Sequence, residues 1–394
     1  MSNDVEQGTA ATADARSLRL LQVGSFTSQF DRLMIAPMLV VIAAEMDRSV
    51  EAVSVAAAAY LLCYGVAQIL WAMVSDRFGR VRTMRLALLL AMVGGLASAA
   101  VPDILWLVVA RGVTGACMAA AIPGALVYIG DTVPVKVRQA PLTDLMTSSA
   151  VGMTMATVGA GIIADFASWR VAFALTAVVA GVLALFMGRM VEPELGPPPR
   201  VWSSLKGVLG NRTALLVLTL VLAEGLVLLG PLTFLPVVLH ASGLSVTLSG
   251  LLTAAYGASV LVFARVVKGR TAKVAPAMLI LFGGSSAVLA YVLLVIDHGA
   301  VAVVVATVLL GGGWAFMHST LQTWATDMAP GYRATAVSLF ATMLFTGSAV
   351  GAAVFGSMVD AGRFTTMFAI TLAVSVPLVV TATLGRRRYA TRGH

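Results

Sequence analysis

The chain has 394 residues, of which 59% are hydrophobic and only 11% are charged, and its mean hydropathy is +0.94. A composition this apolar excludes a soluble globular domain and indicates a membrane protein built from spanning helices. The net charge of +8 does not point to nucleic acid as a partner, because the basic residues lie in short loops between apolar runs.

The first 17 residues are polar and carry both signs of charge, so we expect a disordered cytoplasmic tail. Beyond them, twelve runs reach the length of about 20 mostly apolar residues that a spanning helix needs. The predicted spans are 18–45, 51–74, 82–101, 104–130, 139–164, 168–190, 212–239, 246–268, 273–296, 299–325, 334–358 and 363–385.

Basic residues alternate between the loops. With the N-terminus in the cytoplasm, 21 Lys and Arg residues fall on that side, and only Arg48, Arg170 and Arg363 on the other. Cytoplasmic loops carry the excess of Lys and Arg in membrane proteins. The pattern therefore predicts a multi-pass protein of the cell (inner) membrane with both termini cytoplasmic.

The longest break between spans, residues 191–211, contains three consecutive prolines at 197–199 and predicts a semi-rigid cytoplasmic linker. Within it, 201–209 could form a short amphipathic helix on the membrane surface. The linker separates two six-helix bundles, 18–190 and 212–385, and residues 386–394 are expected to form a second cytoplasmic tail. The predicted fold is all-α, with twelve transmembrane helices in two bundles that repeat at an offset of about 194 residues.

One face of the first span carries polar side chains at intervals of three and four: Gln22, Ser25, Gln29 and Arg32. Asp31 lies beside this stripe. Ionisable groups at this depth are costly unless they meet a partner or a wet cavity, so a functional site is the first hypothesis. We expect Asp31 to carry protons, and Gln29 and Arg32 to contact substrate. A purely structural Asp31–Arg32 pair is the alternative, weakened because adjacent helical residues point about 100° apart.

The second and third spans are joined by the turn Ser75-Asp76-Arg77-Phe78-Gly79-Arg80. This turn resembles the loop 2–3 signature of the major facilitator superfamily, although Ala72 and Val74 stand where the family has Gly and Leu. The resemblance implies that Asp76, Arg77, Gly79 and Arg80 latch the two halves together on the cytoplasmic side. An ordinary positively charged loop would explain the arginines but not the order of the residues.

The fourth span contains Arg111, and counting at about 1.5 Å per residue places it at a depth similar to that of Asp31. Arg111 also resembles the arginine of the helix-4 motif that drug/proton antiporters of this superfamily tie to proton coupling. A structural arginine that reaches the outer interface is the alternative. The fifth span departs from the antiporter pattern, because Ala156-Thr157 replaces the expected glycine-proline, and this favours other transport modes.

The second bundle offers further candidates. Glu224 lies in the position that repeats Asp31, and Gly230-Pro231 interrupts its helix; it could recognise cations, carry a proton or hold the helix through a hydrogen bond. Trp314, His318 and Gln322 recur every four residues and could form a polar-aromatic wall of the substrate cavity. A histidine that only joins two helices is the alternative.

The resemblance to the drug/proton antiporter branch implies a secondary active transporter, not an enzyme, that exports a small organic molecule by proton-coupled alternating access. Its partners would be the substrate, protons and the lipid bilayer, and it would act as a monomer without cofactor, metal or nucleic acid. Cys63 and Cys117 have no metal-like spacing, and no Walker-type loop for ATP occurs in the sequence. A proton symporter or a uniporter for a small metabolite is the alternative.

Overall fold

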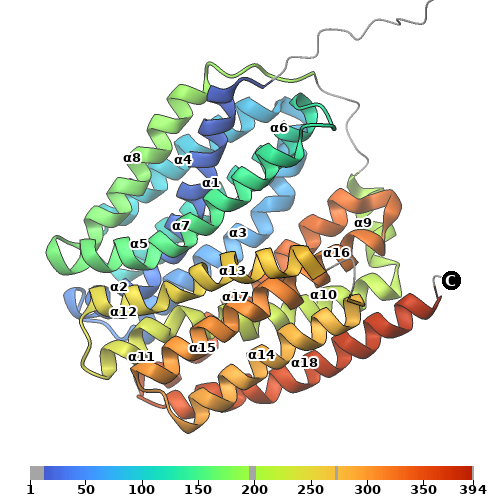
Figure 1. Cartoon of the computed structure of the whole chain (residues 1–394). Helices are drawn as coiled ribbons and strands as arrows, with labels where there is room; N and C mark the ends of the chain where they lie inside the picture. Colours follow the sequence, from blue (N-terminus) through green and yellow to red (C-terminus); the bar gives the residue numbers. More distant parts are fainter. Residues whose placement is uncertain (1–12, 195–200, 271–273, 393–394) are drawn as a thin grey trace, which may run out of the picture.

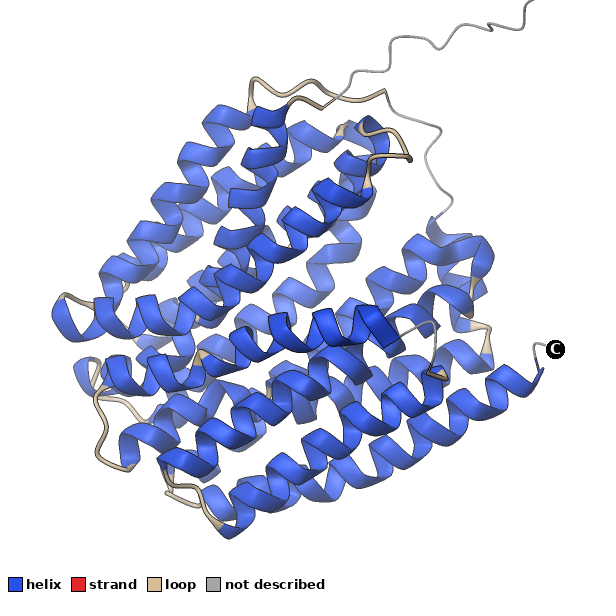
Figure 2. Cartoon of the chain, in the orientation of Figure 1, coloured by secondary structure: helices blue, strands red, loops and turns tan. Residues whose placement is uncertain are grey.

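The computed structural model describes residues 13–194, 201–270 and 274–392, and all regular elements in these ranges are helices (Figures 1 and 2). Most of the predicted tail 1–17 and the prolines at 197–199 lie outside them. The first half contains α1 Ala15–Leu33, α2 Ile35–Glu45, α3 Val50–Phe78, α4 Arg80–Ala100, α5 Ile104–Met118, α6 Ala121–Thr132, α7 Gln139–Phe166 and α8 Trp169–Met187.

The second half begins with the short helix α9 Val201–Leu209, as the sequence allowed. Its α-helices are α10 Arg212–Glu224, α11 Leu235–Ala241, α12 Val246–Thr253, α13 Ala255–Arg270, α14 Pro276–Ile296, α15 Ala300–Gly313, α16 Ser319–Asp327, α17 Arg333–Asp360 and α18 Phe364–Arg392. Two π-helical turns, Gly225–Leu229 and Trp314–His318, and the 3₁₀ turns Pro231–Phe234 and Pro330–Tyr332 lie between them. Within the described ranges eleven helical segments could each cross a membrane, and the bent pair α1–α2 makes the predicted twelve.

The first span is not the straight helix predicted over 18–45. It bends by 45° between α1 and α2, at Met34. Pro37 explains the bend, because its ring has no N–H and clashes with the carbonyl four residues earlier, that of Leu33. Asp31 and Arg32 therefore lie immediately before a break in the backbone.

The seventh span is interrupted in the same way. Pro231 cannot donate to the carbonyl of Val227, and the helix widens into a π-turn just before it. The hydroxyl of Tyr291 donates to this freed carbonyl, so the break is satisfied inside the bundle. Both halves thus begin with a span that breaks directly after its buried carboxylate.

Two helix ends differ from the predicted boundaries. Asp14 accepts a hydrogen bond from the backbone N–H of Ser17 and starts α1 at Ala15 rather than at 18. At the other end, residues 386–392 are not a separate tail, because α18 continues to Arg392. The guanidinium of Arg386 holds this last turn against the rest of the bundle through an ion pair with Asp327 at 3.2 Å.

Glycines set the closest helix crossings at equivalent places in the two halves. A Cβ on Gly152 of α7 would lie 2.6 Å from the carbonyl oxygen of Phe26 on α1, and one on Gly347 of α17 would lie 1.9 Å from that of Leu222 on α10. The fifth span of each half therefore packs backbone to backbone on the first span of the same half. Small residues make such contacts possible in membranes.

The halves meet at the end of the bundle away from the termini, here called the far end; the end that carries both termini is the terminal end (Figure 1). There α3 packs on α17, and α7 packs on α12. Two carboxylates cross between the halves at this end. Asp360 accepts from the backbone N–H of Val50 at 2.9 Å, and Asp165 accepts from that of Thr247 at 2.7 Å. Each carboxylate ends the fifth span of its half and binds the positive N-terminus of the second span of the other half.

Toward the terminal end the halves diverge, with α1 and α6 on one side and α9 and α16 on the other (Figure 1). Charged groups at this end pair within their own halves: Arg80 binds Asp131 at 3.1 Å in the first half, and Arg386 binds Asp327 in the second. The contacts between the halves are therefore concentrated at the far end, and the terminal end, where the halves diverge, is called open here.

Gly347→Ala should destabilise the protein, because the new Cβ would enter the backbone of α10, and overpacking of this kind costs about 1–3 kcal/mol. Gly130→Ala is the matched control: Gly130 is also helical, but a Cβ there meets nothing within 4 Å. We expect the control to be neutral or stabilising by up to about 1 kcal/mol. The measurement is the midpoint of thermal unfolding of both variants in the same detergent. Equal midpoints would contradict the close crossing of α10 and α17.

Candidate functional site

Polar side chains on α1 point into the first half rather than toward lipid. The hydroxyl of Ser25 bonds that of Ser149 on α7, and Ser28 bonds the hydroxyl of Tyr64 at 3.3 Å and donates to the carbonyl of Met118 at 3.2 Å. Because no water is present in the bilayer core, each of these groups needs a partner from a neighbouring helix. These bonds fix the rotation of α1 about its axis, which decides where Asp31 and Arg32 face.

Asp31 forms a fully buried ion pair with Arg111 of α5. The guanidinium binds the carboxylate with two nitrogens, Nη2 to Oδ2 at 3.0 Å and Nη1 to Oδ1 at 3.3 Å, and Nη2 also donates to the backbone carbonyl of Asp31 at 3.1 Å. Thr176 of α8 donates to Oδ1 at 2.9 Å. The sequence predicted that Asp31 and Arg111 lie at similar depths in the membrane, and the structure brings them into contact. It also adds Thr176, which the sequence analysis did not identify.

Two aromatic rings enclose the guanidinium of Arg111. Its Cζ lies 4.5 Å from the ring centre of Tyr60 and 4.6 Å from that of Phe173, on α3 and α8. Both side chains of the ion pair are completely inaccessible to solvent. Arg111 therefore does not reach the outer interface; the first, second and sixth spans of the first half enclose it in a site that solvent does not reach.

Arg32 faces the other half, although it follows Asp31 directly. Its Cζ lies 6.0 Å from the ring centre of Tyr64 and 5.0 Å from that of Phe345, and these two rings meet edge to face. Phe345 belongs to α17, so Arg32 lies at the seam between the halves. It makes no ion pair with Asp31, which excludes the structural pairing of these neighbours.

Glu224 is paired too, with a residue that the sequence assigned to the substrate wall. Nδ1 of His318 lies 3.2 Å from Oε2 of Glu224, and the carboxylate is fully buried. The ring of Trp314 stacks on that of His318 with centres 3.7 Å apart, and the ring centre of Phe340 lies 5.4 Å from that of His318. The first span of each half thus carries a carboxylate that binds a basic group of the fourth span of the same half.

The two glutamines of the predicted substrate site lie in different surroundings. Gln29 is 9% exposed and its Oε1 has no hydrogen-bond partner, next to the close contact of α1 with Gly152. Gln322 is exposed, one turn beyond His318 toward the terminal end. The structure therefore brings Trp314 and His318 into contact with each other and leaves Gln322 outside this cluster.

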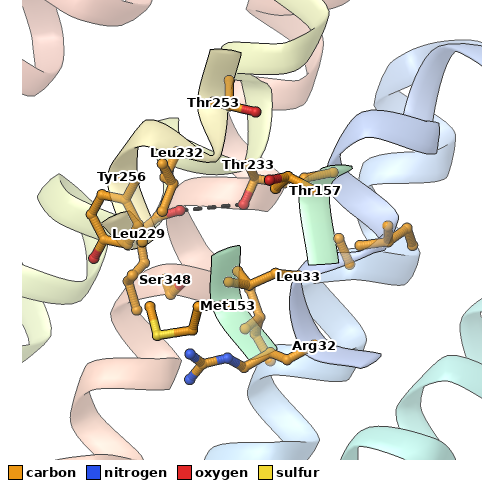
Figure 3. A pocket seen from close by; sticks show the side chains of 15 residues that line it. Arg32, Leu33, Met153, Thr157, Leu229, Leu232, Thr233, Thr253, Tyr256 and Ser348 are labelled. Atoms are coloured by element: carbon orange, nitrogen blue, oxygen red, sulfur yellow. Dashed lines mark hydrogen bonds between the residues drawn. The ribbon is translucent and has the colours of Figure 1, made fainter. Parts of the chain in front are cut away.

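A pocket lies between the halves next to Arg32 (Figure 3). Side chains of both halves line it, among them Met153 and Thr157 of α7 and Tyr256 of α13. Its cavity volume is about 30 Å³, which is room for a few water molecules. Among the described residues, no three His, Cys, Asp or Glu side chains lie close enough to hold a metal ion.

The predicted latch residues are paired within the first half. Asp76 forms an ion pair with Arg80, and Arg80 also donates to Ser75 at 3.2 Å. Arg77 lies over the neighbouring ring of Phe78, with its Cζ 5.8 Å from the ring centre. With the terminal end open, these residues do not bridge the halves in this structure.

Gly79 has a positive φ of 109°, which favours glycine, and a Cβ there would lie 2.6 Å from Cδ of Glu192. The two oxygens of Glu192 accept from the backbone N–H groups of Val81 and Arg82, both at 3.0 Å. Glu192 therefore caps α4 from the linker. Sequence reasoning missed this role, because nothing in the linker itself indicates which helix it will reach.

The sequence profile described as Major Facilitator Superfamily matches residues 21–352, most of the chain. The chain belongs to the major facilitator superfamily. A search of curated proteins found no match. As a major facilitator transporter, the protein is a multi-pass membrane protein, and the family indicates transport of a small molecule rather than enzymatic catalysis.

Solved structures of similar fold are transporters. A bacterial homolog of the human lysosomal transporter Spinster, in an inward-facing and unoccupied conformation, has a TM-score of 0.79 at 16% identity, covering 95% of this chain and 98% of its own. A D-xylose-proton symporter has a TM-score of 0.78 at 16% identity, with 94% and 96% covered, and the nucleoside transporter NupG one of 0.73 at 15% identity, with 93% and 98% covered. At these identities the likeness shows the fold alone.

Proposed function

We propose that this transporter is a proton-coupled exporter of a small organic molecule that works by alternating access. The observation that carries the proposal is the buried ion pair of Asp31 and Arg111 in the middle of the first bundle. Buried charges within spans are costly and mark proton or substrate pathways in transporters. Protonation of a carboxylate that is paired with an arginine breaks the ion pair, because the arginine keeps its positive charge while the carboxylate becomes neutral.

The geometry suggests how protonation of Asp31 changes the conformation. A neutral Asp31 no longer balances Arg111, so the two bonds of the pair weaken. Arg111 also holds the backbone carbonyl of Asp31, one residue before Arg32 and three before the bend at Met34. Release of this carbonyl loosens α1 next to its break, where the chain can change direction with the least loss of hydrogen bonds.

The second buried pair, Glu224 with His318, supplies a further titratable site in the other half. Protonation of either side chain changes the charge of the pair, so the pair can respond to the same proton gradient. Oε1 of Glu224 has no hydrogen-bond partner, which leaves room for a second donor. We assign the Glu224–His318 pair to proton binding and, as the sequence predicted, Trp314, His318 and the exposed Gln322 to substrate contact, although Gln322 lies apart from the other two. Cation recognition by Glu224 is the less favoured role, because the ring of His318 already binds one oxygen of its carboxylate.

Closure of the terminal end requires contacts that this structure does not contain. We propose that Asp76 then meets the N-terminus of a helix of the second half, with Arg77, Gly79 and Arg80 shaping the turn. The far end supports this idea, since Asp165 and Asp360 cap helices of the opposite half there. The excess of Lys and Arg in the loops of the terminal end supports a cytoplasmic location for this end.

A proton symporter or uniporter is the second candidate. The observation that favours it is the fifth span, where Ala156-Thr157 stands in place of the glycine-proline of antiporters. In the structure α7 runs unbroken from Gln139 to Phe166, and its one proline, Pro141, lies in the first turn rather than at the centre of the span.

The double variant Asp31→Asn/Arg111→Gln should abolish the response of transport to pH. The double change is used because Asp31→Asn alone would leave a buried arginine unpaired, at a cost of about 3–5 kcal/mol. In proteoliposomes with and without a pH gradient, three labelled probes are followed: benzoate, benzamide and tetraphenylphosphonium. We expect wild type to move at least one probe against its gradient and opposite to the protons, whereas the double variant retains only exchange at equal concentrations.

The exposed Asp47→Asn variant is the matched control and should behave as wild type. A double variant that still drives uphill transport would remove Asp31 from proton coupling. Movement of a probe together with the protons would replace export by symport.

Asp76→Asn should raise the population that is open at the terminal end. Loss of a carboxylate at a helix N-terminus costs about 1–2 kcal/mol, or a factor of about 5–30 in the ratio of the two states. Spin labels at the exposed positions Val135 and Ala334, one in each half, report the distance across this end. If the distance distributions of Asp76→Asn and of the control Asp47→Asn are the same at equal pH and in the same lipid, Asp76 is not a latch.

A further inference from the structure

One of the acidic and basic side chains buried in the described parts of the chain forms no ion pair. These side chains are Asp31, Arg32, Arg111, Glu224 and His318. Asp31 is balanced by Arg111, and Glu224 is bound by His318. Arg32 is 6% exposed, forms no ion pair with any described residue, and its Nε has no hydrogen-bond partner. A buried N–H group without an acceptor is costly, so an acceptor that a bound molecule brings to Arg32 would stabilise it.

Two hydroxyl groups of the other half are unpartnered at the same pocket. Tyr256 of α13 and Ser348 of α17 line the pocket with Arg32, and each is buried with its hydroxyl oxygen lacking a hydrogen-bond partner (Figure 3). Three buried groups, one from the first half and two from the second, thus present hydrogen-bond donors to one space. Donors without acceptors are the pattern expected of a site for a negatively charged group.

The orientation of Arg32 fits a planar anion. The rings of Tyr64 and Phe345 lie within 6.0 Å of its Cζ, so the guanidinium is held by cation–π contacts rather than by hydrogen bonds. Its N–H groups remain available for a carboxylate, which an arginine can bind with two parallel bonds. The cavity volume of about 30 Å³ suits a carboxylate group in place of water, but not a whole organic molecule.

We propose that the substrate is an organic anion whose carboxylate binds Arg32, Tyr256 and Ser348 at the seam between the halves. The remainder of the substrate lies between the two halves, outside this small cavity. Because the three groups come from both halves, a bound carboxylate holds the seam together at this depth. The inference rests on the proposed transport function and specifies its substrate class.

The test compares carboxylates with their amides, which have the same shape but no charge. The purified full-length protein is titrated at constant pH with benzoate and benzamide, indole-3-acetate and indole-3-acetamide, and hexanoate and hexanamide, and binding is measured by thermal stabilisation. We expect the carboxylate of at least one pair to bind about tenfold or more tighter than the amide, as for a hydrogen-bonded charge. Arg32→Gln should abolish this preference, and Arg32→Lys should retain part of it.

Arg19→Gln, which removes an exposed arginine of the same helix, is the matched control and should bind as wild type. If Arg32→Gln does not fold, Tyr256→Phe and Ser348→Ala each remove one donor and should each weaken carboxylate binding. The proposal is overturned if no carboxylate is preferred over its amide, or if the preference survives in Arg32→Gln or in both hydroxyl variants. This measurement uses no proton gradient, so a negative result leaves the proposal of proton-coupled transport untouched. Conversely, a protein that binds the carboxylate but does not exchange it for protons would still support an anionic substrate.

Discussion

The ion pair between Asp31 and Arg111 is the interaction on which the first half depends. It joins three spans, because Asp31 lies on α1, Arg111 on α5 and the additional donor Thr176 on α8. The free energy needed to remove two charged groups from water can exceed the free energy that their attraction returns. Removal of one partner from a buried pair nevertheless destabilises a protein by about 3–5 kcal/mol, because the other charge is left unpaired. A buried ion pair stabilises a protein little more than apolar side chains of the same size would. The proposed function explains its presence better, because protonation of Asp31 would break the pair.

The two halves use the same construction. In each, a first span breaks at a proline after a buried carboxylate, a glycine of the fifth span packs on its backbone, and an aspartate at the end of the fifth span caps a helix of the other half. The far end is thus held by contacts between helix ends, which can separate without disturbing the interior of either bundle. The terminal end has the corresponding charges, but they pair within their own halves. In the proposed alternating-access mechanism, helix-end contacts between the halves are exchanged between the two ends.

The sequence predicted the twelve spans and the depth of Asp31 and Arg111, because apolar length and helical rise are local properties. It did not predict that Glu224 binds His318: the π-turn from Trp314 to His318 shifts the register of that span, and a count at constant rise cannot anticipate it. The sequence analysis did not predict the bend at Met34, although Pro37 lies close to it. An apolar run that contains a proline is still long enough to span the membrane, so apolar length alone does not show whether the helix bends. Tyr256 and Ser348 carried no signal, because hydroxyls are common in spans and only the structure shows which lack partners.

An anionic substrate changes the energetics of export. Exchange of an organic anion for a proton moves two charges in the same electrical sense, and each is worth about 2.3 kcal/mol per 100 mV. The membrane potential then assists export in addition to the pH difference. In the proposed cycle, Asp31 takes up its proton as its ion pair with Arg111 breaks.

The central claim is that Asp31 gains and loses a proton during transport. Infrared difference spectra between alkaline and acidic pH, recorded on the protein in lipid, measure this directly. The account predicts a band of a protonated carboxylic acid that appears on acidification of wild type and is missing in Asp31→Asn/Arg111→Gln. Identical difference spectra for the two proteins would show that Asp31 stays ionised, and would contradict the account.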